Sequence, residues 1–487
     1  MPQSGFVDVS KEVGAFEVKG GGPALDRCLV VDVDGDGFED IVAWACGKFN
    51  LRLFMNHNGK WFTDETEERG LLGEWGELHI CNAFDFRCRG HFDLYVGNWE
   101  HSKCSNRLFL NDGAGHFTPS GFFFPHGSKG VMFCDVNGDG WIDMLDSGEE
   151  ADEGGTLFMN LGGQILADET RDRFGGKRVM GYQGCAFADF NNDGYPDMFT
   201  TGWYYGGGIC HMYVNDGAGH FREVTDKYDL TFHEECNGAD GAAFADLNNS
   251  GNLDLIAVKN GTVWIHENVD NGRSFPRRAV IEANDFESDP EKWCGESVAI
   301  ADFDNDGYLD LYVAGTKHVY RNEGNFKFTK AWEIPVPPGE QTRTLSFGDL
   351  NCDGKVDILY SALGHRLRLY RNMVSSAGSW LELNLIGPSR DAGGYGVRIS
   401  VFDHGHAGEM SHFRGMRESN SGYMYHVTPS RLLHFGGLEP DRKYDLHVKL
   451  PFHRGEFTIA GVSPGKRLTL DCNPDKGHHA RILGDRP

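Results

Sequence analysis

Between residues 1 and 375, short apolar runs alternate with loops that are rich in Asp, Asn and Gly. One run leads into each loop, as in Gly184-Cys-Ala-Phe-Ala188, and another leaves it, as in Asp310-Leu-Tyr-Val-Ala314. A third run of the type Arg52-Leu-Phe-Met-Asn56 follows, and a turn then gives a fourth, which begins near Phe62 in the first copy. Apolar runs of about four to eight residues between turn residues predict β-strands. The pattern therefore predicts four strands in each period.

The loops contain a nine-residue motif that occurs seven times. Its copies start at residues 32, 85, 135, 189, 246, 302 and 349, at spacings of 47 to 57 residues. A period of about 50 residues with strand-rich content is typical of a β-propeller with one blade per repeat. The fourth strand is missing after Asn372, and Phe6-Val-Asp-Val-Ser10 has the form of Phe62-Thr-Asp-Glu-Thr66. We therefore expect an all-β fold, with a seven-bladed β-propeller over residues 1–375 that the N-terminal strand closes.

The motif places side-chain oxygens at positions 1, 3, 5 and 9 and a glycine at position 6. Hard oxygen donors around a tight glycine turn are typical of a calcium loop, and an Asx-rich turn without metal is the alternative. We expect about five to six structural calcium sites and no organic cofactor. The candidate ligands are Asp32, Asp34, Asp36 and Asp40; Asp135, Asn137, Asp139 and Asp143; Asp189, Asn191, Asp193 and Asp197; Asp246, Asn248, Ser250 and Asp254; Asp302, Asp304, Asp306 and Asp310; and Asp349, Asn351, Asp353 and Asp357.

Two copies of the motif are altered. The copy at 246 has Ser250 at the fifth position, which predicts weaker binding. The copy at 85 has Arg87 and Arg89 at the third and fifth positions, so positive charge lies where the ion would be. We expect this copy to bind no calcium, with either guanidinium group in place of the ion.

These loops and the apolar runs around them resemble FG-GAP/VCBS repeats, which also form the propeller of integrin α-subunits. Residues after 376 resemble the ASPIC/UnbV domain of the cartilage acidic protein family through Trp380-Leu-Glu-Leu-Asn-Leu-Ile386, Gly394-Tyr-Gly-Val-Arg-Ile-Ser-Val401 and Leu433-His-Phe-Gly-Gly437. The resemblance implies the propeller, calcium binding, and a small β-domain at 376–472. Alternation of apolar and polar residues in 380–386, 396–402, 444–450 and 466–470 also predicts strands there. Residues 473–487 are polar, and we expect them to form a loose tail.

The charge balance narrows the class of partner. The chain has 46 Lys+Arg and 72 Asp+Glu, a formal net charge of −26, which excludes a nucleic-acid backbone as the main partner. No apolar run is long enough for a membrane span. No leader precedes the first strand, so we expect a cytoplasmic protein if Met1 is the native start, and an extracellular or periplasmic one if a leader was removed. The sequence does not indicate the oligomeric state.

Polar residues recur at the start of each innermost strand. Six residues before the first Asp of each motif lie Asp26, His79, Lys129, Gln183, Asp240, Glu296 and Arg343. Seven inner strands converge on the propeller axis, so these side chains are predicted to form a ring at the channel mouth, opposite the calcium loops. A wet channel lined by unspecific polar residues is the alternative. Asp240 and Glu296 come from adjacent blades, and one of two neighbouring carboxyls would have a raised pKa and act as an acid.

The other members of the ring suggest further roles. His79 is a candidate base, Lys129 and Arg343 are candidates to hold a carboxylate or an oxyanion, and Asp26 is a further candidate carboxylate. Gln183 is a candidate ligand contact. The neighbouring loops on this face add aromatic and histidine side chains that suit a small organic or sugar-like ligand, with scattered surface aromatics as the alternative: Trp44, Trp99, Trp203, Tyr204, His318 and His365.

Two functions follow from these features. The first is an enzyme of the lyase, isomerase or cyclase type that uses the ring for cofactor-free acid–base chemistry. The second is an exported, non-catalytic module for ligand recognition or adhesion. The mixed ring and the absence of a visible leader favour the first, which we prefer, whereas the family resemblance and the low free calcium of most cytosols favour the second.

Overall fold

The computed structural model describes residues 5–14, 16, 25, 27–45, 51–73, 75–98, 105–124, 127–147, 154–179, 184–202, 210–228, 230, 239–286, 295–339, 342–362, 367–419, 430–473 and 481–486. For residues 123, 342, 343, 362 and 481–486 it describes the backbone alone. Within these residues, no helix is long and apolar enough to cross a membrane.

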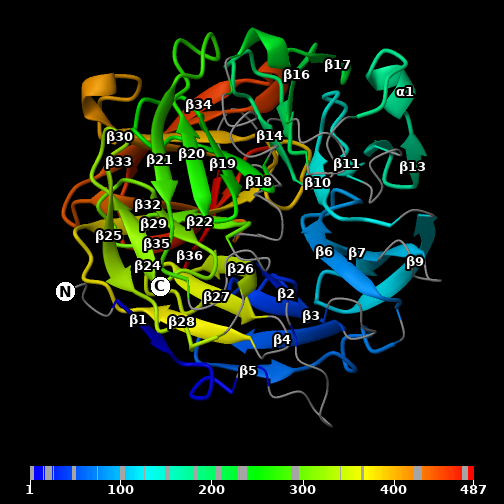
Figure 1. Cartoon of the computed structure of the whole chain (residues 1–487), viewed down its shortest axis with the longest axis horizontal. Coiled ribbons are helices and arrows are strands. Elements are labelled where there is room, and N and C mark those ends of the chain that lie inside the picture. Colours follow the sequence, from blue (N-terminus) through cyan, green and yellow to red (C-terminus); the bar gives the residue numbers. More distant parts are fainter. Residues whose placement is uncertain are drawn as a thin grey trace.

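Seven antiparallel four-stranded sheets form the blades of a propeller (Figure 1). From inner to outer strand, the first four are β2 (Arg27–Val31), β3 (Asp40–Trp44), β4 (Leu51–His57) and β5 (Trp61–Asp64); β6 (Leu78–Phe84), β7 (Asp93–Asn98), β8 (Asn106–Asn111) and β9 (Phe117–Phe124); β10 (Val131–Cys134), β11 (Asp143–Asp146), β12 (Thr156–Leu161) and β13 (Ile165–Asp168); and β14 (Cys185–Ala188), β15 (Asp197–Thr200), β16 (His211–Asn215) and β17 (Phe221–Glu223). The other three are β18 (Gly241–Ala245), β19 (Asp254–Lys259), β20 (Thr262–His266) and β21 (Arg277–Glu282); β22 (Val298–Ala301), β23 (Asp310–Val313), β24 (His318–Asn322) and β25 (Phe328–Glu333); and β26 (Thr342–Gly348), β27 (Asp357–Ala362), β28 (Arg368–Asn372) and β1 (Phe6–Asp8). The helical segments are α1 (Thr170–Arg173) and short 3₁₀ turns at Thr225–Lys227, Met410–His412 and Pro451–His453.

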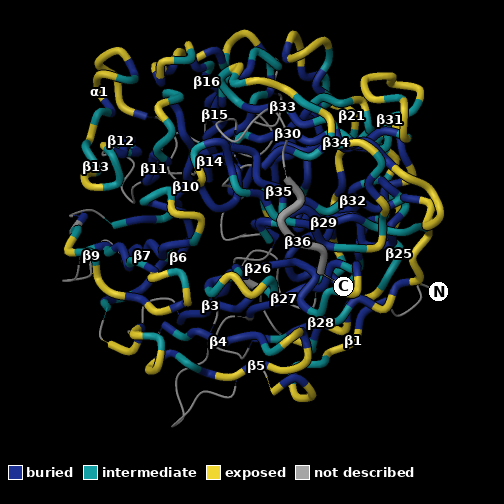
Figure 2. Tube along the Cα trace, turned by 180° about the vertical axis from the view of Figure 1, so that it is seen from behind, coloured by how far each residue is buried: buried dark blue, intermediate teal, exposed yellow. Residues whose placement is uncertain are grey.

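Burial explains the sequence of each blade. The inner strands β2, β10, β14, β18 and β22 are buried along their whole length, whereas outer strands such as β5 and β25 alternate or are largely exposed (Figure 2). A strand covered on both faces reads as a continuous apolar run, and an edge strand needs only one apolar face. The predicted all-β propeller with seven blades is therefore the fold of this part of the chain.

An asparagine at the end of the third strand ties each blade to the previous one. Asn56 Nδ2 donates to the carbonyl of Glu39 in its own blade and to that of Leu350 in the preceding blade, both at 2.9 Å. The same pair of hydrogen bonds, one within the blade and one to the preceding blade, recurs at Asn111, Asn160, Asn215, Asn268, Asn322 and Asn372. In the fifth blade the sequence alignment places His266 at this position, but a register shift at Ile265/His266 gives the role to Asn268. Each of these buried asparagine amides is hydrogen-bonded to two neighbouring blades and so helps to fix the angle between them.

The first strand of the chain completes the last sheet. β1 pairs antiparallel with β28, with Phe6 opposite Asn372 and Asp8 opposite Tyr370. Phe6 is 1% exposed and its ring contacts Phe303 edge-on, with the ring centroids 5.7 Å apart. The N-terminal strand is therefore the fourth strand of the last blade, which has no fourth strand of its own after Asn372.

The C-terminal residues form two further four-stranded sheets around one hydrophobic cluster. Their strands are β29 (Ser379–Ile386), β30 (Arg398–Asp403), β31 (Phe413–Glu418), β32 (Leu433–Leu438), β33 (Tyr444–Lys449), β34 (Glu456–Val462), β35 (Lys466–Asp471) and β36 (Arg481–Arg486). We call residues 379–473 with β36 the β-domain. The expectation of a loose tail over 473–487 is wrong for β36, which pairs antiparallel with β35. Ladder hydrogen bonds come from the backbone, so a polar edge strand needs no apolar run.

Candidate functional site

The seven Asp loops share one backbone geometry. In the copy at 32, Asp32 Oδ1 accepts a hydrogen bond from the Gly35 amide at 2.7 Å, and its Oδ2 accepts one from the Gly37 amide at 2.8 Å. Gly37 has a φ of +91°, and the glycine at position 6 of the other six copies also has positive φ. That conformation costs side-chain-bearing residues energy, which explains the glycine in every copy. The loop conformation thus follows from the motif.

Position 9 has a structural role that the sequence did not reveal. Asp40 accepts hydrogen bonds from the amides of Asn56 and Val33, and so links the loop to the third strand. In the copy at 85, which carries arginines, Asp93 still accepts the amide of Asn111 at 2.7 Å. The aspartate at position 9 therefore serves the fold even where no ion is expected.

The donor set of several loops fits a hard cation. Oxygen atoms of Asp32, Asp34 and Asp36 lie within 4.8 Å of one another, and the same is true within the copies at 189 and 302. Burial raises the pKa of Asp32 to about 6, the Gly37 amide opposes this shift, and the charge of Asp36 adds to it. Among the described residues, the buried oxygens Oδ1 of Asp189 and Oδ2 of Asp197 accept no hydrogen bond. Clustered, buried carboxylates with spare oxygens are the arrangement that calcium requires.

Arginine side chains occupy part of this space in two copies. In the copy at 85, Arg87 lies 3.1 Å from Asp93 Oδ1, where a guanidinium was expected in place of the ion. In the copy at 302, Arg321 from β24 donates to Asp304 Oδ2 at 2.7 Å and to Asp306 Oδ2 at 2.5 Å. Arg321 was not anticipated from the sequence, and it competes with a cation for the same oxygens.

The β-domain covers the face of the propeller that carries the Asp loops. Arg467 donates to the carbonyls of Gly37 and Asp349, so it joins the first and last loops. Other contacts come from Arg398 to the carbonyl of Asp189 at 2.8 Å, and from Arg454 to the carbonyl of Gly138 at 2.7 Å. These contacts bring the domain onto loops that lie around the ring.

Two of these arginines are neutralised inside the β-domain. Arg467 lies 2.7 Å from Glu382 Oε2, and Arg398 lies 2.6 Å from Glu418 Oε2, with all four side chains at most 10% exposed. Burial raises the pKa of Glu382, but the charges and hydrogen bonds of Arg467 and His434 together outweigh it, so the pKa is lowered. Sequence reasoning missed these residues. The available signal was a charged residue between the leucines of an otherwise apolar alternating strand, as at Glu382.

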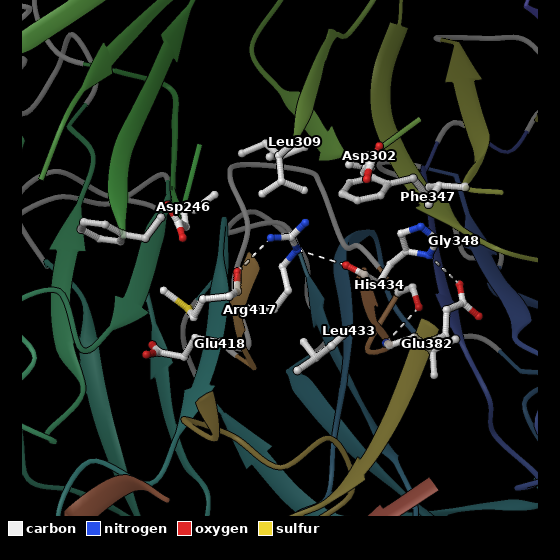
Figure 3. Close-up of a pocket in the computed structure, with 18 of the residues that line it drawn as sticks. Asp246, Asp302, Leu309, Phe347, Gly348, Glu382, Arg417, Glu418, Leu433 and His434 are labelled. Carbon is white, nitrogen blue, oxygen red and sulfur yellow. Dashed lines mark hydrogen bonds and ion pairs between the residues drawn. The ribbon is translucent and has the colours of Figure 1, made fainter. Parts of the chain in front are cut away.

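A small cavity lies between the propeller and the β-domain (Figure 3). Its volume is about 70 Å³, and it is lined by Asp246, Asp302 and Phe347 from the propeller and by Arg417 and His434 from the β-domain, among others. The His434 ring lies beside Glu382, with Nδ1 at 3.2 Å from Oε1. Its lining is mostly apolar, and a cavity of this size has room for a few water molecules rather than an organic substrate.

The structure brings together one pair of the predicted ring. Asp240 immediately precedes β18 and Glu296 lies two residues before β22, and the side chains are 2% and 8% exposed. Burial raises the pKa of Asp240 to about 7, the charge of Glu296 adds to this shift, and Lys259 opposes it. Thr201 Oγ1 donates to the Asp240 carbonyl at 3.1 Å, which holds the backbone at this point. These two carboxyls lie at the end of the inner strands opposite the Asp loops.

Other predicted residues have different surroundings. His79 lies in β6 and is 1% exposed, and its Nδ1 lies 2.8 Å from the Ser128 carbonyl in the next blade. The prediction that Trp44 is a surface contact for ligand is wrong, because it is 2% exposed and donates from Nε1 to the His79 carbonyl at 3.2 Å. Its ring fills the space between the first two blades.

His318 lies on the third strand of its blade and its Nδ1 contacts Asp285. Lys129 is partly exposed, two residues before β10. The side chain of Arg343 is not described. The remaining candidates lie outside the described residues: Asp26, Gln183, Trp99, Trp203, Tyr204 and His365.

Comparisons with known proteins agree with the repeat pattern. A model of the FG-GAP-like repeat matches residues 85–145, 135–200, 246–313 and 302–360. Cartilage acidic protein 1 of Xenopus tropicalis is 21% identical over 313 residues, which are 58% of this chain and 47% of that protein. A T-cell immunomodulatory protein homolog of Plasmodium yoelii yoelii is 24% identical over 247 residues, which are 44% of this chain and 33% of that protein. The matches thus span less than half the length of either relative.

Solved structures with a similar arrangement of strands have low sequence identity. BBS1N, solved in complex with ARL6DN, has a TM-score of 0.45 at 12% identity, covering 76% of this chain and 98% of its own. Sqt1 of Saccharomyces cerevisiae has a TM-score of 0.44 at 11% identity, with coverages of 73% and 86%. Rhamnogalacturonan lyase PL11 of Bacillus licheniformis has a TM-score of 0.39 at 12% identity, with 72% of each chain covered. The four matches show that the chain contains FG-GAP-like repeats, and in sequence it is similar to cartilage acidic protein 1.

Proposed function

We propose that this protein is a ligand-binding propeller that uses the face opposite its Asp loops. The observation that carries the proposal is the pair of buried carboxyls, Asp240 and Glu296, which come from neighbouring blades at the ends of their inner strands opposite the Asp loops. With the pKa of Asp240 raised to about 7, this carboxyl is partly protonated near neutral pH. It can then donate one hydrogen bond and accept others, which suits a small hydroxyl-rich or amine-bearing ligand.

The same pair can support acid–base chemistry of the lyase, isomerase or cyclase type. A protonated carboxyl gives a proton to a leaving oxygen, while an ionised partner takes one from carbon or oxygen. The second candidate function is non-catalytic recognition at the same place. The contact of His79 with the Ser128 carbonyl favours this function. His79 was the candidate base, and one of its ring nitrogens already has a partner in the protein. For such a module we propose an extracytoplasmic location, where free calcium is sufficient to fill loops of moderate affinity.

We further propose that calcium stabilises the blades. Asp32, Asp34 and Asp36 would hold one ion, Asp189, Asp193 and Asp197 another, and these ions would supply the positive charge that the buried carboxylates need. The ions are structural in this proposal, because the β-domain covers the face on which the loops lie.

A ligand screen tests the proposal. Differential scanning fluorimetry with neutral sugars, amino sugars and small hydroxy acids would identify compounds that raise the melting temperature of the wild-type protein. Asp240→Asn and Glu296→Gln should abolish the shift, whereas the control Asp216→Asn, at an exposed turn where Asp216 pairs with His220, should retain it. Proton NMR of the mixtures separates the two functions, because an enzyme converts the compound and a recognition module leaves it intact. Retained shifts in both ring variants would refute the site.

A further inference from the structure

The connection between β30 and β31 folds as three consecutive turns. The amide of His406 donates to the carbonyl of Asp403 at 3.0 Å, that of Glu409 to His406 at 3.0 Å, and that of His412 to Glu409 at 2.8 Å. Gly405 and Gly408 have φ of +85° and +88°, so the first two are separate tight turns, and contacts between the flanking side chains bring residues at this spacing together. Asp403, His406, Glu409 and His412 therefore form a row on one side of the connection, which is the orange coil at the edge of Figure 1. The spacing Asp-x-x-His-x-x-Glu-x-x-His is visible in the sequence.

Three members of the row converge on one point. His406 Nδ1 lies 3.2 Å from Glu409 Oε2, and the rings of His406 and His412 stack with centroids 3.8 Å apart and planes at 12°. One ligand atom from each of the three lies within 4.8 Å of the other two. Ligand atoms around a tetrahedral zinc ion are roughly 3.3 Å apart, as bonds of about 2.0–2.1 Å require. Small rotations of these side chains, which are 35% to 58% exposed, would close that difference.

The carboxylate at the start of the row orients one of the imidazoles. Asp403 Oδ2 lies 3.1 Å from His412 Nδ1, and Arg414 holds the same carboxylate with two hydrogen bonds of 2.8 and 2.7 Å. Metal-binding histidines commonly donate their second ring N–H to a carboxylate in this way, which fixes the tautomer and the direction of the other nitrogen. This hydrogen bond makes Nε2 of His412 the candidate ligand atom.

We propose that His406, Glu409 and His412 bind one Zn²⁺ ion and that Asp403 orients His412 for it. Two imidazoles and a carboxylate suit a borderline cation, whereas the all-oxygen Asp loops suit calcium. Of the four groups of candidate metal ligands among the described residues, this is the one that contains histidine. Three protein ligands leave a fourth coordination position for water or for a group from another molecule. The ion would replace the proton between His406 and Glu409, and it would tie the connection together.

Calorimetric titration of the full chain with zinc chloride in calcium-saturated buffer tests this site. The wild type should bind one equivalent that His406→Ala and His412→Ala each lose, and Asp403→Asn should weaken the affinity about 10–100-fold. The matched control is His116→Ala, since His116 is an exposed histidine that pairs with Asp112 at 3.4 Å without a second histidine. It should bind zinc as the wild type does.

Cobalt substitution gives a second measurement that does not depend on stability. Co²⁺ in the wild type should give the visible absorption bands of a tetrahedral site, and these bands should disappear in His412→Ala. Melting curves without metal would establish that each variant is folded. Zinc stoichiometry that is unchanged in both histidine variants, or the absence of stoichiometric binding in the wild type, would overturn the proposal. Wild-type affinity in Asp403→Asn would overturn the orienting role.

Discussion

Asp240→Asn tests whether a buried carboxyl pair lies at the end of the inner strands opposite the Asp loops. The folded-state pKa of Asp240 is about 7, raised from 3.8 by burial and, in second place, by the charge of Glu296. A carboxyl with a raised folded-state pKa contributes stability that is complete below the unfolded pKa near 4 and is lost as the pH rises towards 7. The shift of about three pKa units corresponds to about 4 kcal/mol. The ionised pair is thus a cost that the wild-type fold carries at neutral pH.

Asparagine keeps the shape of Asp240 and removes its titration. The free energy of unfolding of the variant should exceed that of the wild type by about 4 kcal/mol at pH 8, and this difference should be about 3 kcal/mol smaller at pH 5. Urea denaturation at the two pH values measures it. Asp112→Asn is the control, because Asp112 is exposed and the Ala114 amide lowers its pKa, so it stays ionised over this range. Parallel changes in the wild type and Asp240→Asn between pH 5 and pH 8 would refute the pair.

Three further predictions concern closure, metal and docking. Phe6→Ala should destabilise the propeller by about 3–5 kcal/mol in chemical denaturation, because Phe6 is buried in the last blade; a loss no larger than that of the exposed Val7→Ala would contradict closure by β1. Excess chelator should lower the melting temperature, because ions that bind only the folded state stabilise it, and Arg89→Ala should leave the calcium content measured by mass spectrometry unchanged. Glu382→Ala should cost about 3 kcal/mol, because Arg467 stays buried without its main carboxylate partner; a loss within error of zero would show that this ion pair does not stabilise the fold.

The blades could be predicted from the sequence because each one obeys local rules. Apolar runs such as those of β14 and β22 are buried on both faces, and the glycine at position 6 meets a backbone requirement within nine residues. Closure by the strand of Phe6 could also be predicted. The last repeat lacks a fourth strand, and the N-terminal segment has the sequence form of the fourth strands in other repeats. The strand β36 could not be predicted from the sequence, because an edge strand that pairs through its backbone needs no apolar pattern.

The surroundings of side chains were harder to predict than the strands. Trp44 lies at the end of a strand, where its neighbours along the chain do not reveal that the next blade covers it. Arg467 and Gly37 are 430 residues apart, and no periodic signal joins residues at such a distance. The row from Asp403 to His412 is different, since its spacing of three is written in the sequence. This spacing indicates a shared site only when the structure shows that a turn joins each member to the next.

The Asp loops and the carboxyl pair lie at opposite ends of the inner strands. In the fifth blade, Asp240 precedes β18 and Asp246 follows it, so five residues lie between the carboxyl pair and the Asp loop. The loop end is covered by the β-domain, and cavities of about 70 and 320 Å³ lie between the two. The proposed ligand site is at the opposite end, where Asp240 and Glu296 lie. Variants at the two ends should consequently act on different properties, with Glu382→Ala altering the docking of the β-domain and Asp240→Asn altering ligand binding.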